Sequence, residues 1–232
     1  MSVEQTQKRT IRSFVKRESR LTKAQELALD SFWVKHGIDY NNELLNLNSE
    51  FKRTAPIIMD IGVGTGDTTF HHAKLHPENN YLAIEVHKPG IGRLLNKIES
   101  NNFKNIKIIN HDVVDVLQQQ IPDRCLSQIF IFFPDPWPKK KHHKRRLINK
   151  DLLDLLKSKL TLNGRIHIAT DWENYAEHIQ ELCVKDKELI NLNSSSKTVP
   201  RPNWRIQTRY ETRGMKLEHN VWDFCYALNI KY

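Results

Sequence analysis

The sequence predicts an α/β fold in which a doubly wound, mostly parallel sheet is covered by helices on both faces. From residue 56 onward, short apolar runs alternate with longer segments of helical character, which is typical of parallel strands joined by right-handed crossovers. The runs are rich in Ile, Val and Phe, as expected for strands buried on both faces. A chain of 232 residues, 39% of them hydrophobic, is large enough for one such sheet.

The N-terminal segment differs from the rest of the chain. Residues 1–20 are polar and basic, so we expect a flexible arm before a single domain at residues 21–232. The sequence has no run of about 18 apolar residues and no apolar stretch of a secretory signal, so we expect no membrane association. The three cysteines are odd in number and lack metal-type spacing, which is typical of a cytoplasmic protein without a metal site.

A helix is expected to begin near the start of the domain. Thr22 and Gln25 have the spacing of a capping box, and Gly37 is a plausible end of the helix. We expect the apolar residues Leu27, Phe32 and Trp33 to lie toward one side of it.

Five parallel strands are expected after this helix, at residues 56–62, 81–86, 106–110, 127–133 and 164–170. The intervening segments can hold helices, for example at residues 66–76, 90–101 and 147–160. Residues 193–203 have the composition of a linker, and the last apolar run, residues 221–230, is expected to add an antiparallel edge strand.

A glycine-rich turn follows the first of these strands. Gly62, Gly64 and Gly66 come directly after Asp60-Ile61, just before a helical segment. Glycines at this place let the backbone turn sharply and approach a ligand in the crevice beyond the strand end. Because the spacing is G-x-G-x-G, the turn alone is as consistent with a structural role as with ligand binding.

Two further acids follow the next two strands. Glu85 is placed to accept hydrogen bonds from both ribose hydroxyls of a nucleoside cofactor, and Asp112 from an adenine amino group. Each acid taken singly could instead be a helix cap or a solvated residue at a strand end. Three acids after three successive strands, beside a glycine turn, together indicate a cofactor crevice.

Asp60 discriminates between the two cofactors that place adenosine in such a crevice. A carboxylate beside the pyrophosphate of a nicotinamide dinucleotide would be repelled, whereas beside the ammonium group of a methionine moiety it would be attracted. The sequence therefore favours S-adenosylmethionine.

The fourth strand is followed by Pro134-Asp135-Pro136-Trp137-Pro138 and then by the densest run of positive charge in the chain, residues 139–146. The prolines are expected to hold Asp135 rigidly in extended and turn conformations at the rim of the sheet. The run can neutralise several phosphates while Trp137 offers an aromatic face to a base. A Lys/Arg run alone is more often a solvated loop or a targeting signal. This run directly follows the strand that ends at the crevice, which favours RNA binding. The net charge of +9 also suits a polyanionic partner.

The stretch PDPWPKKKHHKRRL at residues 134–147 closely resembles the motif of the tRNA (guanine-N7)-methyltransferases of bacterial type. The glycine turn, Glu85, Asp112, Asp171 and the Thr208–Glu211 segment fall in matching order, so that the resemblance covers about residues 55–230. It implies a Rossmann-like sheet of the class I methyltransferase type, S-adenosylmethionine as cofactor, and tRNA as substrate. The implied product is N7-methylguanosine at position 46 of the variable loop.

The resemblance also implies roles for individual residues. It assigns to the methyl donor the four acids Asp60, Glu85, Asp112 and Asp135. We expect the glycines of the turn, Gly62, Gly64 and Gly66, to bind the cofactor as well, and Asp135 to have a part in catalysis. It assigns to the substrate the residues Lys139, Asp171, Thr208, Arg209, Tyr210 and Glu211. It assigns to RNA contact the residues Lys141, His142, His143, Lys144, Arg145 and Arg146. The chain departs from the family at Asp60, where Glu is usual, and at Lys141, where Arg is usual.

Structural alternatives stay open for the C-terminal residues. Asp171 could be the N-cap of a helix, and Thr208 with Glu211 has capping-box spacing, which is compatible with a place in the site. The arginines Arg201, Arg205, Arg209 and Arg213 recur every fourth residue, and we expect at most scattered RNA contacts from them.

Two other functions remain as alternatives. One is methylation of another RNA base, and the other is an RNA-binding accessory protein that keeps the fold without catalysis. No obligatory protein partner is evident, and we expect a monomer or a homodimer.

Overall fold

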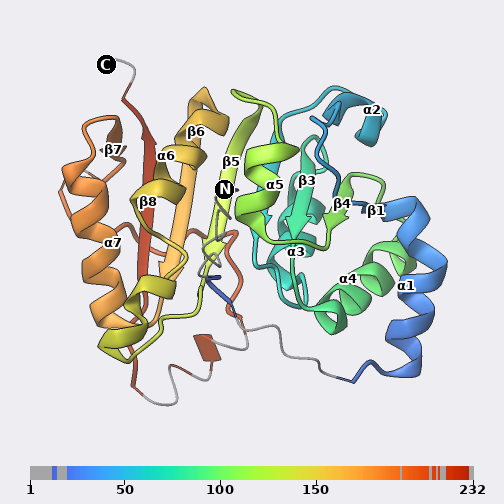
Figure 1. The fold of residues 1–232 in the computed structure, drawn as a ribbon, viewed down its shortest axis with the longest axis horizontal. Helices are drawn as coiled ribbons and strands as arrows, with labels where there is room; N and C mark the ends of the chain where they lie inside the picture. The colour runs from blue at the N-terminus through green and yellow to red at the C-terminus, as the bar shows by residue number, and fades with distance from the viewer. Residues whose placement is uncertain are drawn as a thin grey trace, which may run out of the picture.

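A computed structural model of the chain describes residues 12–14, 20–193, 195–208, 211–212, 214 and 218–229. Over these residues an eight-stranded sheet lies between two layers of helices (Figure 1). The strands are β1 Gly37–Ile38, β2 Ile57–Ile61, β3 Asn80–Ile84, β4 Ile106–Ile109, β5 Leu126–Phe132, β6 Leu160–Thr170, β7 Leu189–Asn191 and β8 Trp222–Leu228. The α-helices are α1 Lys23–His36, α2 Leu47–Phe51, α3 Asp67–Leu75, α4 Lys88–Ser100, α5 Val113–Gln119, α6 Lys150–Lys159 and α7 Glu173–Lys185. A 3₁₀ helix, η1, spans Lys140–Arg145.

The strand order is β1-β4-β3-β2-β5-β6-β8-β7, with parallel pairing from β1 to β6 and antiparallel pairing of β8 with β6 and β7. The chain proceeds outward from β2 to β3 and β4, and then returns to place β5 on the other side of β2. Ligands of doubly wound sheets bind beyond the strand ends at such a switch point. The glycine turn after β2 and the Asp135 loop after β5 therefore flank the expected crevice.

The prediction of a doubly wound, mostly parallel sheet is confirmed, and all five expected parallel strands are present. The expected antiparallel strand is also present as β8, but it lies one strand inside the sheet, because β7 pairs with its outer side. The three-residue β7 and the two-residue β1 are too short to give a sequence signal. The prediction also did not specify α2, α5 or α7.

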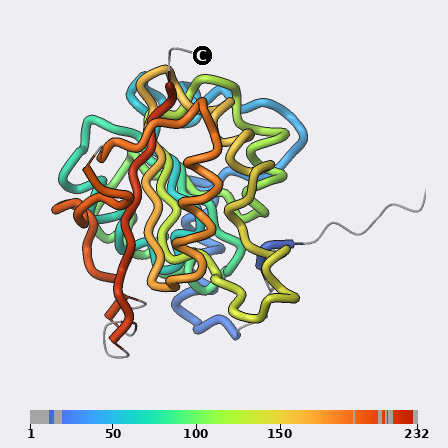
Figure 2. Tube along the Cα trace, turned by 90° about the vertical axis from the view of Figure 1, so that its left-hand side faces the viewer, coloured from blue at the N-terminus to red at the C-terminus, as the bar shows by residue number. Residues whose placement is uncertain are grey.

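Two apolar cores lie on the two faces of the sheet. In β2, Met59 and Ile61 face the core formed with α2, α5, α6 and α7, whereas Ile58 faces the core formed with α1, α3 and α4. Figure 2, which views the sheet from its β7 end, shows helices on both sides of it. Because alternate residues of a strand point to opposite faces, Asp60 points to the α3 side.

Helix α1 begins as predicted, with a complete capping box between Thr22 and Gln25. Gly37 ends it, although its φ of −79° is not left-handed. A Cβ at this position would lie 2.2 Å from the Trp33 ring, so glycine is required by close packing. Phe32 and Trp33 pack against the core, but the prediction for Leu27 was wrong, since its side chain is 65% exposed.

Among the helices of the described ranges, none combines the length and the apolar character that a membrane span requires.

Candidate functional site

The glycine turn after β2 has a backbone that only glycine adopts without strain. Gly62, Gly64 and Gly66 have φ values of 74°, 56° and 68°. A Cβ at Gly62 or Gly64 would meet nothing within 4 Å, whereas at Gly66 it would lie 2.4 Å from Leu94. The turn therefore packs against α4 through Gly66 and presents the backbone of the other two glycines to open space.

Asp60 lies in β2 directly below this turn, and its side chain is buried. Thr69 of α3 donates a hydrogen bond of 2.5 Å from Oγ1 to Oδ2 of Asp60. Burial raises the pKa of Asp60 to about 7, although the Thr69 hydrogen bond opposes the rise, and the nearby Glu85 adds to it. A buried carboxyl group with such a pKa would be ionised by a neighbouring cation.

Glu85 follows β3 and connects the two strand ends through its carboxylate. Oε2 accepts a hydrogen bond of 2.7 Å from the Gly64 amide, while Oε1 accepts bonds of 2.8 Å and 2.9 Å from the Val86 and His87 amides. A carboxylate has about four acceptor positions, so Glu85 can accept a further hydroxyl while it holds these three amides.

Asp112 follows β4 and is the N-cap of α5, with Oδ1 accepting a 3.1 Å hydrogen bond from the Val114 amide. The helix-cap alternative for Asp112 is therefore confirmed. This bond uses one oxygen of a buried carboxyl group whose pKa is raised by burial. The described Arg12 lowers the same pKa, so part of the predicted arm lies near the strand ends.

These residues fit a nucleoside cofactor with a positively charged amino-acid tail. The glycine turn has open space beside its backbone, Glu85 can accept a ribose hydroxyl, and Asp60 can be ionised by an ammonium group. They lie at the carboxyl ends of β2 and β3, and Asp112 follows the neighbouring β4. S-Adenosylmethionine has this combination of groups.

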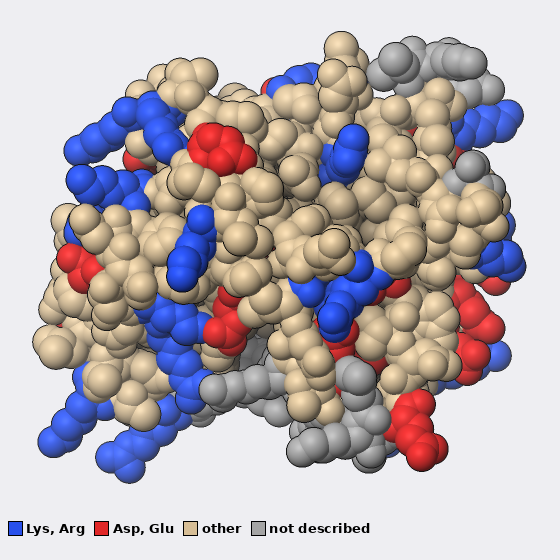
Figure 3. Space-filling model, turned by 180° about the vertical axis from the view of Figure 1, so that it is seen from behind, with Lys and Arg blue, Asp and Glu red and all other residues tan. Residues whose placement is uncertain are grey.

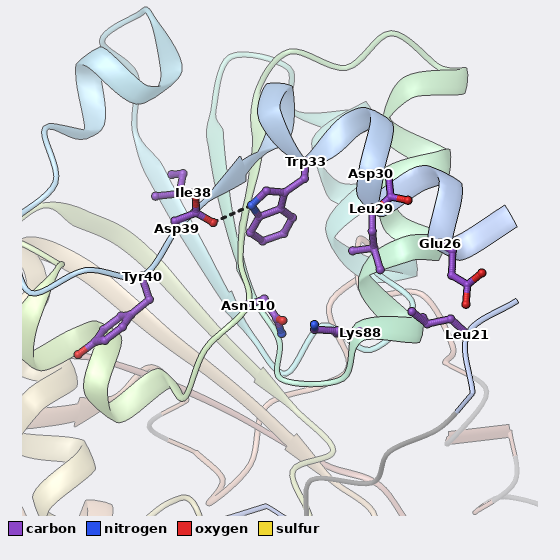
Figure 4. A pocket seen from close by; sticks show the side chains of 10 residues that line it. All are labelled: Leu21, Glu26, Leu29, Asp30, Trp33, Ile38, Asp39, Tyr40, Lys88 and Asn110. Carbon is purple, nitrogen blue, oxygen red and sulfur yellow. Dashed lines mark hydrogen bonds between the residues drawn. The ribbon is translucent and has the colours of Figure 1, made fainter. Parts of the chain in front are cut away.

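A cavity of about 510 Å³ lies to the side of the crevice, between α1 and the ends of β1 and β4. Figure 4 shows Trp33 and Leu29 of α1 on one side of it and Lys88 and Asn110 on the other. Trp33 donates from Nε1 to Asp39 at its rim. The ten residues that line this cavity include none of the predicted site residues, so it is a neighbour of the crevice and not its centre.

The Asp135 loop after β5 has an unusual backbone. Phe133 and Trp137 both have left-handed conformations, with φ values of 52° and 48°. For a residue other than glycine this conformation costs about 1–2 kcal/mol. The prolines were expected to hold extended and turn conformations, but the structure places Asp135 between two strained residues. Such strain is concentrated at functional sites.

Trp137 contacts the predicted N-terminal arm. Its Nε1 donates a 3.0 Å hydrogen bond to the carbonyl oxygen of Ser13, and the Arg145 guanidinium lies 5.0 Å from its ring centroid. Sequence reasoning missed this contact, because no local pattern connects residues 124 positions apart. Apart from residues 12–14 and Arg20, the predicted arm lies outside the described residues.

The basic run forms η1, and its cations are not equivalent. Lys139, Lys141 and Lys144 are exposed, while His142, His143 and Arg145 are partly exposed. Slight desolvation and the charges of neighbouring cations, Lys141 above all, lower the pKa of His142. On the opposite side of the molecule, Lys and Arg are mixed with acidic residues and form no single patch (Figure 3). The exposed part of the run is thus a local source of positive charge beside Asp135.

Arg146 requires a correction, because it was expected to contact RNA and is buried. Its guanidinium donates to the Pro136 carbonyl oxygen at 3.0 Å and to Oδ1 of Asn174 at 2.8 Å, and it lies 4.7 Å from the Tyr175 ring centroid. Arg146 therefore holds the Asp135 loop against α7.

Asp171 lies directly after β6, beside Gly214 and His219 of the C-terminal segment, by which we mean the described residues between Thr208 and His219. The N-cap of α7 is Trp172, so the N-cap alternative for Asp171 was wrong. A Cβ added to Gly214 would lie 2.6 Å from Asp171 Oδ2, and His219 Nδ1 lies 3.8 Å from the same oxygen. Asp171 therefore lies beside Gly214 and His219, which follow the predicted substrate residue Glu211 in the chain.

Thr208 and Glu211 form the expected capping box. The Glu211 amide donates to Thr208 Oγ1 at 3.1 Å, and the Thr208 amide donates to Glu211 Oε2 at 3.4 Å. Arg209 and Tyr210, also predicted for the substrate, lie outside the described residues. Sequence reasoning also missed the role of Arg205, which is completely buried and binds Glu211. No local signal distinguishes it from the half-exposed Arg201.

A doubly wound sheet with a glycine turn and strand-end acids defines a methyltransferase of the Rossmann-like class. A family model described as "Putative methyltransferase" matches residues 54–224. At the level of fold alone, the chain is similar to the aminoglycoside resistance methyltransferase NpmB1 and the 16S rRNA methyltransferase KamB. Each comparison has a TM-score of 0.54 and covers 81% of this chain and 95% of the other, at 13% and 10% identity.

Similarity in sequence is much higher to proteins named tRNA (guanine-N(7)-)-methyltransferase. The chain is 49% identical to one from Nitrosospira multiformis, over 95% of this chain and 96% of the relative. It is 45% identical to one from Pseudoalteromonas atlantica and 44% identical to one from Yersinia pestis, each over 94% of this chain and 91% of the relative. The chain therefore belongs to the tRNA (guanine-N7)-methyltransferase family.

Proposed function

We propose that this chain transfers the methyl group of S-adenosylmethionine to N7 of guanine in tRNA, at position 46 of the variable loop. One observation above all supports the site: the buried acids and glycine turn after β2 to β4 lie across the switch point from the strained Asp135 loop and its cations. One side suits a cationic nucleoside, and the other suits a phosphate chain.

In this proposal, seven residues hold the donor: Asp60, Gly62, Gly64, Gly66, Glu85, Asp112 and Asp135. Asp60 binds the ammonium group, Glu85 accepts from ribose hydroxyls, and Asp112 accepts from the adenine amino group. The bound donor supplies a methyl group on a positively charged sulfur.

Guanine binds between the Asp135 loop and the C-terminal segment. Asp135 and Asp171 accept hydrogen bonds from guanine N–H groups, and thereby orient N7 toward the methyl group. Lys139 and the residues Thr208, Arg209, Tyr210 and Glu211 form the rest of this side. The contact of Asp171 with Gly214 supports the placement, because it brings Asp171 beside the part of the chain that follows Glu211.

The tRNA backbone binds to residues of η1 and to the N-terminal arm. The η1 residues are the exposed Lys141 and Lys144 and the partly exposed His142, His143 and Arg145. Arg146 has no part in this contact, since its donors are used inside the protein. The chain acts alone or as a homodimer in the cytoplasm.

No general base is needed for this reaction. Guanine N7 has no proton at neutral pH, so that no proton must be removed before it attacks. Asp135 and Asp171 contribute by positioning, which supplies most of the rate in such a transfer.

To test the proposal, the purified chain is incubated with labelled methyl donor and unmodified tRNA, and the modified nucleoside is identified. We expect N7-methylguanosine, and its loss when the guanosine at position 46 is replaced by adenosine. A different methylated base would establish the first alternative. Binding of tRNA without binding of S-adenosylmethionine would establish an accessory protein.

A further inference from the structure

Arg205 has the largest of the fully buried side chains, and its guanidinium group contacts four partners. Its Nε and Nη2 each donate a 2.8 Å hydrogen bond to the two oxygens of Asp223 in β8. Its Nη1 and Nη2 donate to the two oxygens of Glu211 at 2.7 Å and 3.2 Å. An unpaired buried cation would be very costly, so this double fork fixes the geometry of both carboxylates around it.

The same guanidinium also lies against the start of the Asp135 loop. Its central carbon is 5.8 Å from the ring centroid of Phe132 and 5.4 Å from that of Phe133. Phe133 is the left-handed residue whose backbone sends the chain toward Pro134 and Asp135. Arg205 is thus in contact with both sides of the proposed guanine site.

Glu211 has its acceptor positions occupied by the protein. Oε2 receives Arg205 and the Thr208 amide, while Oε1 receives Arg205 and, at 3.5 Å, Arg201. About four positions are available on a carboxylate, so these donors fill them. Glu211 therefore holds Thr208 from within the protein, and the Thr208 hydroxyl oxygen accepts a hydrogen bond from the Glu211 amide.

We propose that Arg205 is a positioning residue, which fixes the capped pair of Thr208 and Glu211 relative to Phe133 and so sets the distance between the two sides of the guanine site. This inference rests on the proposed function. The side chain of Arg205 is 0% exposed, and therefore Arg205 acts through its neighbours and not through RNA phosphates.

Arg205→Lys is the direct test, because lysine keeps the charge but has no planar fork to hold two carboxylates. Arg201→Lys is the matched control, since Arg201 contacts the same Glu211 but is 49% exposed. Single-turnover methylation at saturating tRNA and donor is measured per folded molecule, together with the Kd values of both ligands. We expect the rate of Arg205→Lys to fall by about 10²-fold, since a displacement of about 1 Å has that effect. We expect both Kd values to stay within about twofold, and Arg201→Lys to resemble the parent.

Two results would overturn the inference. An unchanged rate per folded molecule would make Arg205 a stabilising residue only. A rate loss that follows weaker tRNA binding, with a flatter salt dependence, would make it a phosphate contact.

A second variant covers the case in which Arg205→Lys does not fold. Glu211→Gln keeps the size of the side chain and removes its charge, and we expect the same selective loss of rate. Where the variant with both Arg205→Lys and Glu211→Gln folds, its loss of single-turnover rate should not exceed that of the more impaired single variant. The reason is that both substitutions break the same contact. Additive losses would contradict this. A parent protein that forms no N7-methylguanosine would instead refute the proposed function, irrespective of the variants.

Discussion

The donor side and the guanine side of the site are built in different ways. On the donor side, Glu85 and Asp112 are held by amides at most 21 residues away in sequence. On the guanine side, the Asp135 loop is strained and is held by Asn174 of α7, by Ser13, which lies 124 residues from its partner Trp137, and by Arg205 against Phe133. The donor crevice is thus determined mainly by local sequence, whereas the guanine site depends on distant parts of the chain.

Of the substitutions that test this difference between the two sides, Glu85→Ala is expected to have the largest effect, and it should act on donor binding. The substitution removes the proposed ribose acceptor and leaves the amides of Gly64, Val86 and His87 without their carboxylate. We expect donor binding to weaken by about 3–4 kcal/mol, while tRNA binding stays nearly unchanged. Calorimetry of both ligands measures this, and an unchanged donor affinity would refute the ribose assignment.

The contrast explains what could be predicted from the sequence. The glycine turn and the acids Asp60, Glu85 and Asp112 were found because each follows a recognisable apolar strand, and their positions along the sheet follow from parallel topology. Arg145 and Arg146 are equivalent in sequence, and only Asn174 and Tyr175 of α7 determine that Arg146 is buried. In the same way, Asp223 distinguishes Arg205 from Arg201, and no periodic pattern contains that information.

Asp135→Asn should affect the guanine side next most strongly. The amide keeps the size of the side chain but is a weaker acceptor for a guanine N–H group. We expect turnover to fall by about 10–100-fold with little change in tRNA affinity, because phosphate contacts set most of the affinity. Equal losses in single-turnover rate and tRNA affinity would make Asp135 a scaffold residue.

Adjacent arginines provide a matched pair on the RNA side. Arg145→Ala should weaken tRNA binding and reduce the slope of log affinity against log salt by about 0.7–0.9, as for one lost phosphate contact. Arg146→Ala should leave that slope unchanged and lower the free energy of unfolding by about 2 kcal/mol, because buried carbonyl and amide acceptors lose their donor. Salt titrations and chemical denaturation distinguish the two, and an equal change of slope would contradict the burial of Arg146.

Near neutral pH, the smallest expected effect is a pH dependence of donor binding. The pKa of Asp60 in the ligand-free protein is about 7, whereas a positively charged donor favours the ionised form. Donor affinity should therefore rise about tenfold per pH unit below about 7 and level off above it, with a proton released on binding. Because the folded pKa is raised, the contribution of Asp60 to stability is present at low pH and is lost as pH rises through 7. Asp60→Asn should remove this rise of donor affinity with pH. If the rise persists in the variant, the titrating group is not Asp60.

The central claim is that methyl transfer depends on positioning and not on removal of a proton. Its most direct test is the single-turnover rate at saturating tRNA and donor between about pH 6 and 9. Saturation removes the contribution of Asp60, and acidic groups of ordinary pKa stay ionised in this range. The partly exposed histidines of the loop, His142 and His143, are then irrelevant to the rate, so we predict a nearly flat profile in the parent and in both alanine variants. A rate that falls toward low pH with a pKa near that of histidine would contradict the claim if His142→Ala or His143→Ala abolished this fall. It would point to an acceptor atom that must first lose a proton.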